Sequence, residues 1–135
     1  MIPRYLLDTN TVSYLITGRP PEVRRRIAGV GLEATAISVV TEAELMYGLA
    51  RKAGAIKQRI ALEIFLSNVV IRVWDSSVAR TYGLLRAEQE RKGRSLSTED
   101  LMIAAHALSL GLILVTHDQT FSFVDGLRTE DWTIP

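Results

Sequence analysis

Short apolar runs alternate along this chain with longer segments of helical periodicity, and this alternation constrains the fold more than any other feature. Four runs are predicted to be buried strands, at residues 5–7, 34–40, 69–74 and 112–115. The tail at residues 127–134 is compatible with one more short strand. Strands that are apolar on both faces and separated by helices are typical of a parallel sheet covered on both sides. The pattern therefore predicts a three-layer α/β/α fold with a central, mostly parallel sheet.

The segments between these runs carry the start and stop signals of helices. Pro21 suits the first position of a helix over residues 22–27, and the glycines at positions 29 and 31 are expected to end it. Another helix is predicted from about Thr41, and Gly54 breaks it. The remaining helices are predicted over residues 9–16, 56–66 and 76–92, and from a cap at Ser97 or Thr98 to Gly111.

The chain has the size and composition of one folded domain. Its 135 residues, 47% hydrophobic and 23% charged, suffice for a single core. It has no cysteine, which excludes a disulfide framework, a thiolate metal site and a thiol nucleophile. The N-terminus lacks the pattern of a signal peptide, and no apolar stretch approaches the roughly 20 residues that cross a bilayer. We therefore expect a single cytoplasmic domain over residues 1–135 with no membrane partner.

Four acidic residues stand where predicted strands give way to helices or loops. Asp8 follows the first strand, and Asp118 follows the strand at 112–115. Glu44 and Asp100 fall near the starts of predicted helices. In a parallel sheet, ligands bind at the edge where the carboxyl ends of the strands meet. Because carboxylate oxygens are the ligands of hard cations, the pattern predicts a Mg²⁺ or Mn²⁺ site that acts on phosphodiesters.

Each acid also has a purely structural interpretation. Asp8 could cap the helix that follows it, and Asp118 could form an Asx turn. Glu44 stands three residues after Thr41, and Asp100 stands three residues after Ser97, which is capping-box spacing. No single acid is therefore specific, and the functional prediction depends on the convergence of all four.

The other residues near these positions are expected to be bystanders. Glu42 and Glu99 lie beside Glu44 and Asp100 but point to different helix faces, so they are predicted to be solvated or capping residues. His106 is expected to be structural, and strand-end alternation should turn His117 away from its neighbours. The sequence contains no Ser-His-Asp arrangement with elbow glycines and no glycine-rich phosphate loop.

The formal net charge of +1 does not by itself indicate a nucleic-acid ligand, but the basic residues are clustered. A basic rim around an acidic centre would suit a polyanionic substrate. The alternative is that these side chains lie on solvated helix faces. The candidate phosphate contacts are Arg19, Arg24, Arg25, Arg26, Arg91 and Arg94.

Four segments together resemble the PIN-domain ribonucleases, and within them the VapC toxins of bacterial and archaeal toxin–antitoxin pairs. The segments are residues 7–10 (LDTN), 41–48 (TEAELMYG), 100–107 (DLMIAAHA) and 111–116 (GLILVT), the last followed by Asp118 and Phe121. Their order and spacing match the family over nearly the whole chain. The resemblance implies a PIN-like domain and a metal-dependent endoribonuclease.

The resemblance also implies a role for each site residue. Asp8, Glu44, Asp100 and Asp118 would form the catalytic and metal-binding quartet, with Asp8 and Asp100 as the most direct ligands of Mg²⁺ or Mn²⁺. Asn10 and Thr116 would be supporting polar groups. The chain departs from the family at His117, next to Asp118, where many members carry an acid or Asn. Family products would carry a 5′-phosphate and a 3′-hydroxyl.

Partners follow from the same resemblance. A VapB-like antitoxin would inhibit the enzyme by laying its tail across the acidic site, and operator DNA would be bound only through that antitoxin. A homodimer is expected, with the apolar helical faces of residues 43–66 serving the second copy or the antitoxin. The substrate would be unpaired RNA, with transfer RNA and ribosomal RNA as plausible targets.

Other functions compete with this interpretation. Haloacid-dehalogenase phosphatases carry a second Asp two residues after the first, but Asn10 stands there. Receiver domains require a Lys after a late strand, where this chain has Thr116 and His117. A further alternative is a metal-stabilised module that binds RNA or a protein partner without turnover, and a metal-dependent cleavage assay separates it from a nuclease.

Overall fold

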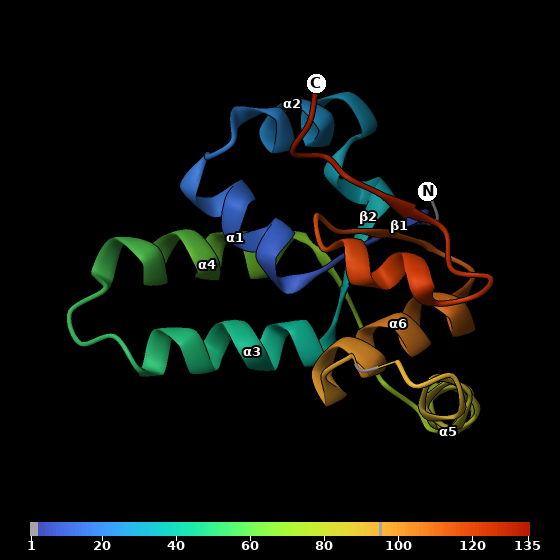
Figure 1. Ribbon diagram of the computed structural model, residues 1–135. Helices are drawn as coiled ribbons and strands as arrows, with labels where there is room; N and C mark the ends of the chain where they lie inside the picture. The colour runs from blue at the N-terminus through green and yellow to red at the C-terminus, as the bar shows by residue number, and fades with distance from the viewer. Residues whose placement is uncertain (1–2, 95) are drawn as a thin grey trace.

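The computed structural model describes residues 3–94 and 96–135, which contain one five-stranded sheet (Figure 1). The strands are β1 (Tyr5–Leu7), β2 (Thr35–Ser38), β3 (Val70–Arg72), β4 (Ile113–Val115) and β5 (Thr129–Glu130). Their spatial order is β3-β2-β1-β4-β5, and each pairs with its neighbours in parallel. The predicted parallel sheet and the short strand in the tail are confirmed.

Helices cover both faces of this sheet, as the prediction of three layers requires. They are α1 (Thr9–Thr17), α2 (Pro21–Val30), α3 (Val39–Ala50), α4 (Ile56–Asn68), α5 (Ser76–Arg91) and α6 (Thr98–Leu110), with short 3-10 helices at η1 (Leu32–Ala34) and η2 (Gln119–Phe123). In Figure 1, α3 and α4 run side by side and project from the sheet, while α5 and α6 lie together on its other side. The two faces are therefore covered by different helix groups.

The side chains of successive strand residues point to opposite faces of the sheet and so belong to two separate halves of the core. Leu7 and Ile37 pack with residues of α1, α2 and α4, whereas Leu6 and Ala36, one position earlier, pack with residues of α5 and α6. All four side chains are completely buried. Successive strand residues point to opposite faces, so a strand that is apolar at every position must be covered on both sides. This explains why the strands are unbroken apolar runs.

Two predicted boundaries are wrong, and both errors have a local cause. The strand predicted at residues 34–40 ends at Ser38, whose side chain caps α3 by accepting a bond from the Val40 N–H (3.1 Å). Val39 and Val40 are apolar and fit a buried strand as well as a helix, so hydropathy alone could not place the boundary between the two elements. Gly29 was expected to end its helix but lies inside α2, which ends at Gly31.

The C-terminal segment covers the half of the core that contains Leu7 and Ile37. Trp132 is 1% exposed, its ring meets that of Tyr5 edge to face with centroids 5.0 Å apart, and its Nε1 donates to Glu130. The segment after β5 is therefore part of the packed domain. Within residues 3–94 and 96–135, no helix is both long and apolar enough to span a bilayer.

We predict that Trp132→Ala lowers the free energy of unfolding by about 3 to 5 kcal/mol, because it removes a fully buried aromatic ring and leaves a cavity. Urea denaturation followed by circular dichroism measures the change. Ile134→Ala is the matched control, because Ile134 is 53% exposed and its truncation should change stability little. Equal effects of the two substitutions would show that the tail does not stabilise the core.

Candidate active site

The acidic residues lie where the order of the strands reverses. β1 is paired with β2 on one side and with β4 on the other, so the chain moves outward in both directions from this central strand. Such a reversal leaves a crevice at the carboxyl ends of the strands, because the following helices go to opposite faces. Asp8 directly follows β1, and Asp118 follows β4 by three residues. The fold therefore brings together two acids that are 110 positions apart.

Asp8 is the most deeply held of the acids, at 5% exposed. Its Oδ1 accepts the Thr11 N–H at 2.8 Å and caps α1, so the structural role and the placement in the site coexist. Its own N–H donates to the Val115 carbonyl at 3.1 Å, which continues the pairing of β1 with β4. Burial raises the pKa of Asp8, against hydrogen bonds from Thr116 and Thr11 that lower it.

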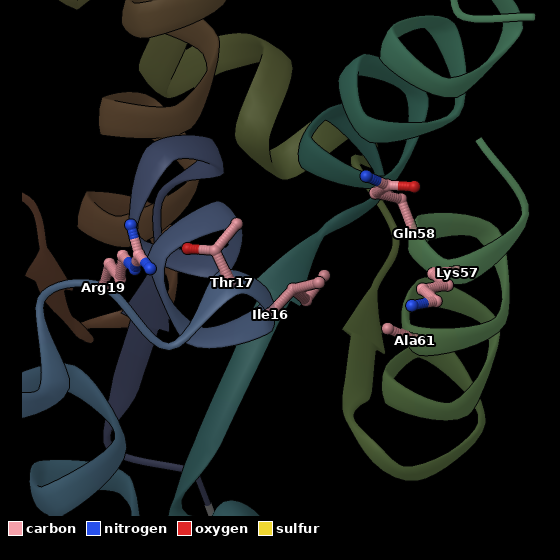
Figure 2. Close-up of a pocket in the computed structure, with 6 residues that line it drawn as sticks. All are labelled: Ile16, Thr17, Arg19, Lys57, Gln58 and Ala61. Atoms are coloured by element: carbon pink, nitrogen blue, oxygen red, sulfur yellow. The ribbon is translucent and has the colours of Figure 1, made fainter.

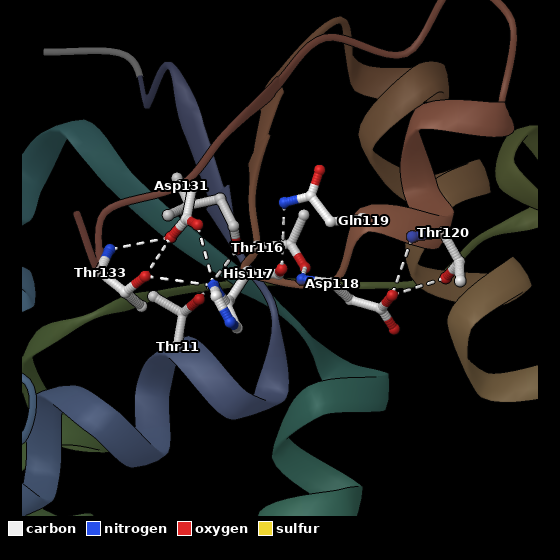
Figure 3. Close-up of polar contacts among 9 residues, drawn as sticks. Thr11, Thr116, His117, Asp118, Gln119, Thr120, Asp131 and Thr133 are labelled. Atoms are coloured by element: carbon white, nitrogen blue, oxygen red, sulfur yellow. Dashed lines mark hydrogen bonds and ion pairs between the residues drawn. The ribbon is translucent and has the colours of Figure 1, made fainter.

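Thr116 links Asp8 to Asp118. Its buried hydroxyl bonds to the Asp8 carboxyl and accepts the backbone N–H of Asp118 at 3.0 Å. Asp118 is exposed, and its Oδ1 accepts the N–H and the hydroxyl of Thr120 at 2.9 and 2.7 Å (Figure 3). The predicted Asx turn is thus present, and it leaves the other carboxylate oxygen, Oδ2, without a bond to this turn.

Glu44 reaches the same place from α3. Its Oε1 accepts the hydroxyl of Thr9 at 2.6 Å, and the Thr41 hydroxyl lies 3.3 Å from that of Thr9. The expected capping box of Thr41 and Glu44 is wrong, because the helix begins at Val39 and Ser38 is its cap. Glu44 therefore lies in the second turn, where it faces α1 rather than its own backbone.

Asp100 enters from the first turn of α6. Ser97 is the N-cap and accepts the Asp100 N–H at 3.1 Å, which confirms the cap predicted at this position. Burial raises the pKa of Asp100, a hydrogen bond from Ser97 lowers it, and the charges of Asp118, Glu44 and Asp8 raise it further. Asp100 is therefore near enough to the other three carboxylates to be repelled by each of them.

These acids line one pocket of about 130 Å³. Its walls are Asp8, Thr9, Asn10, Glu44, Asp100, Ile103, Asp118 and Phe121. Sequence reasoning did not single out Thr9 or Ile103. Thr9 adjoins Asp8, and Ile103 follows Asp100 by one helical turn, so the spacing could have indicated both. Asn10, predicted to be a supporting group, is exposed at this pocket.

Within the described part of the chain, the carboxylates are not arranged closely enough to enclose a cation by themselves. Among the residues that the structure describes, no three His, Asp or Glu side chains are grouped closely enough to hold a metal ion. Like charges repel, and hydroxyl or amide donors hold the carboxyls of Asp8, Glu44 and Asp118 apart. Mg²⁺ is commonly bound through one or two carboxylates and several waters, so this oxygen-only pocket fits such an ion. The metal-ligand assignments remain predictions.

Neither histidine belongs to the pocket. His106 is fully buried, with its Nδ1 2.8 Å from the Ser38 hydroxyl, and burial lowers its pKa. Its predicted structural role agrees with these contacts. His117 turns away from the acids, and its Nδ1 lies 2.9 Å from Asp131 Oδ2 and 3.2 Å from the Thr133 hydroxyl (Figure 3). Alternation at the strand end therefore predicted its direction correctly.

Most of the arginines expected to contact phosphates are engaged within the protein. Arg24 donates to the carbonyls of Leu15 and Ile16, both at 2.9 Å, and so closes the end of α1. Arg94 bonds to the carbonyl of Phe123 and stacks on its ring. Arg25, Arg26 and Arg91 lie 3.7, 3.9 and 2.6 Å from Glu22, Glu130 and Glu88, respectively. Their role in binding RNA stays a prediction.

Known proteins are similar to this chain in sequence and in fold. The PIN domain family model matches residues 5–127. The chain is 38% identical over 131 residues to the tRNA(fMet)-specific endonuclease VapC of Shigella flexneri, covering 96% of this chain and 98% of that protein. It is 37% identical over 130 residues to ribonuclease VapC2 of Haemophilus influenzae, with the same coverage. A crystal structure of DNA-bound VapBC from Salmonella typhimurium contains a chain with a TM-score of 0.90 and 34% identity, covering 98% of this chain and 99% of that one.

We predict that Asp8→Asn raises the free energy of unfolding at pH 7 in metal-free buffer. A carboxyl whose pKa is raised on folding favours the folded state below its unfolded pKa, and this contribution is lost as the pH rises through the folded value. The advantage of the variant should therefore shrink as the pH falls toward the ordinary value of 3.8. Asn preserves the cap, since Asn and Asp cap helices about equally.

Urea denaturation at pH 7 and at pH 4 measures this difference. Asp75→Asn is the matched control, because Asp75 caps α5 by the same bond, to the Val78 N–H at 3.1 Å, but is exposed and outside the pocket. An equal gain in the free energy of unfolding in both variants would show that the acidic pocket does not destabilise the charged form of Asp8.

Proposed function

From the premise that this chain belongs to the PIN domain family, and within it to the VapC group, we propose that it is an endoribonuclease that requires Mg²⁺ or Mn²⁺. The proposal rests on one observation, the convergence of four carboxylates from separate segments on a single pocket. Beyond the effect of burial, the negative charges of Asp118, Glu44 and Asp8 raise the pKa of Asp100, which supports the action of the four carboxylates as one unit. Acid clusters of this kind are typical of enzymes that use a cation to cut phosphodiester bonds.

Asp8, Glu44, Asp100 and Asp118 would hold the cation through carboxylate oxygens. The donor set suits a hard ion, since it contains neither thiolate nor imidazole. A bound Mg²⁺ or Mn²⁺ supplies activation of water and neutralises charge that develops on the phosphodiester. Burial raises the pKa of Asp100, and repulsion from the other three carboxylates raises it further; a cation among the carboxylates would relieve that repulsion, which also supports this assignment.

The chain's own residues orient this machinery. Thr9 holds Glu44, Thr116 joins Asp8 to the backbone of Asp118, and the Thr120 contacts direct the Asp118 side chain. Positions fixed before substrate binds reduce the reorganisation required during the reaction. Asp100, which enters the pocket from the first turn of α6, would be a direct ligand of the cation together with Asp8. Asn10 at the pocket would contact the substrate.

The partners we propose are a VapB-like antitoxin, which inhibits the enzyme, and a second copy of the chain. Solved relatives from Salmonella typhimurium and Rickettsia felis are VapBC complexes with DNA, so operator binding here would also require the antitoxin. Along α4, Ile56, Ile60 and Ile64 are 68, 55 and 61% exposed and lie on one face. Such an apolar stripe suits a protein contact.

The target we propose is transfer RNA, with ribosomal RNA as the alternative. The relative from Shigella flexneri carries a name that specifies initiator transfer RNA. The enzyme would then act in the cytoplasm, where both targets occur. Unpaired RNA suits the site, because its backbone can be drawn into a pocket that a duplex could not enter.

We predict that the purified protein cuts total cellular RNA at discrete sites with Mg²⁺ or Mn²⁺, and that chelator abolishes the cuts. Asp100→Asn should lower the rate by about 100-fold or more, because it removes a charged ligand of the cation. Glu99→Gln is the matched control, since the adjacent Glu99 is exposed and does not line the pocket. Gel electrophoresis and sequencing of the ends would locate each cut.

The same experiment tests the alternative of a metal-stabilised module without turnover. Intact RNA in the presence of metal, together with binding of Mn²⁺ by calorimetry, would favour the module. Cleavage that survives chelation, or that is equally weakened by Glu99→Gln and Asp100→Asn, would contradict the assignment of the acidic pocket as the catalytic centre.

A further inference from the structure

The acidic pocket opens into a longer groove that follows α1. A second hollow of about 280 Å³ shares Thr9 and Glu44 with the acidic pocket. A third, of about 660 Å³, shares Ile16, Thr17 and Gln58 with the second. Figure 2 shows its two sides, with Ile16 and Thr17 from the end of α1 on one and Lys57, Gln58 and Ala61 from α4 on the other. The three hollows adjoin one another through these shared residues, from the carboxylates to the start of α4, and we call them together the α1 groove.

The α1 groove changes sign along its length. Beyond Glu44 its charged lining residues are all basic, with Arg51 and Lys52 in the second hollow and Arg19 and Lys57 in the third. These side chains are exposed, and within the described part of the chain they make no ion pair with an acid. They differ in this from Arg25, Arg26 and Arg91, so their charge is available to an external anion.

The start of α4 adds positive potential at the far end. Its N-cap is Ala55, which offers no side-chain bond, and its first turn contains no acid. The first N–H groups of a helix have no intrahelical acceptor and carry partial positive charge. Lys57 and Gln58 lie in this first turn and line the groove. The basic side chains and the backbone therefore favour the same kind of ligand.

Gly48 lines the groove without a side chain that would narrow it. It lies in the middle of α3 and lines the second hollow, one turn after Glu44 and one turn before Arg51 and Lys52. A Cβ atom built at Gly48 would meet no other part of the protein within 4 Å. Glycine destabilises a helix relative to alanine, so packing within the described chain does not account for it. Gly48 therefore leaves the α3 side of the second hollow open to a ligand that approaches the helix backbone.

We propose that the α1 groove binds the sugar-phosphate backbone of the single-stranded RNA next to the scissile bond, with Arg51, Lys52 and Lys57 as the phosphate contacts. This inference rests on the proposed nuclease function. A pocket of four carboxylates repels a polyanion, so the substrate needs cations directly beside it. The apolar floor, with Ile16, Leu45 and Leu62, offers surface for nucleotide bases.

RNA suits this groove better than an antitoxin segment does because of the charge pattern. The free cations follow one another along the path and no acid interrupts them beyond Glu44. A peptide that covers the acidic pocket would present basic groups there, and the basic half of the groove would repel those groups if they continued. A phosphate backbone is attracted by every hollow except the acidic one, which a cation neutralises.

The test measures the affinity of the Asp100→Asn protein for a fluorescent single-stranded RNA between about 50 and 200 mM salt. Each phosphate contact contributes a slope of about −0.7 in a plot of log K against log salt. The triple substitution Arg51→Gln, Lys52→Gln and Lys57→Gln should therefore flatten the slope by about 2. Gly48→Leu should weaken binding several-fold without lowering the melting temperature, because it fills the groove and removes a helix glycine.

The charge-matched control is Arg4→Gln, Arg80→Gln and Arg128→Gln, three exposed arginines that do not line the groove and that make no ion pair with an acid within the described residues. This control should leave the slope close to that of the parent. Equal flattening by both triple variants would overturn the proposal, since net charge alone would then explain it. An unchanged slope in the groove variant, with loss of binding to a co-purified antitoxin, would assign the groove to a protein and overturn it as well.

The two proposals can fail separately. If the native protein cuts RNA but the groove variant binds it with the parental slope, the groove assignment is wrong and the nuclease stands. If the native protein cuts no RNA but the groove variant alone flattens the slope, the nuclease is wrong and the groove remains an RNA site. Circular dichroism of each variant confirms that the fold is retained.

Discussion

The parallel pairing of β1 with β2 and β4 is the constraint on which the structure depends. β1 is buried on both faces and occupies the point where the strand order reverses. Its last residue pairs with Val115, and the N–H of Asp8 extends the ladder by one bond. The position of Asp8 is thereby set by the sheet itself. The helix α3, which follows β2, brings Glu44 to the same edge; α6 brings Asp100, and the turn after β4 brings Asp118.

The electrostatics of the site follow from this geometry. A buried carboxylate loses solvation, and three more acids raise the cost of its charge. Hydroxyl groups from Thr9 and Thr116 offset part of that cost for Glu44 and Asp8. The remainder would favour binding of the cation that we propose. A polyanionic substrate then requires basic groups beyond the acids, and Arg51 and Lys52 lie in the hollow next to them.

Sequence patterns predicted elements better than they predicted boundaries or partners. The strand before Asp8 and the cap at Ser97 were correct because each has a local signal, an apolar run or a capping side chain. The start of α3 was misplaced because Val39 fits a strand or a helix equally well. The basic residues were chosen by their clustering along the chain, which does not show that Arg24 binds the carbonyls of α1.

The sequence by itself determined the class of fold, the four acids and the family, because periodicity and motif spacing are properties of the chain. Tertiary structure decided which polar groups meet. Thr9 reaches Glu44 across 35 positions, and Arg51, Lys57 and Arg19 come to line one groove only because α1, α3 and α4 pack together. Contacts between residues far apart in the chain depend on helix packing and strand order, and no local pattern encodes either.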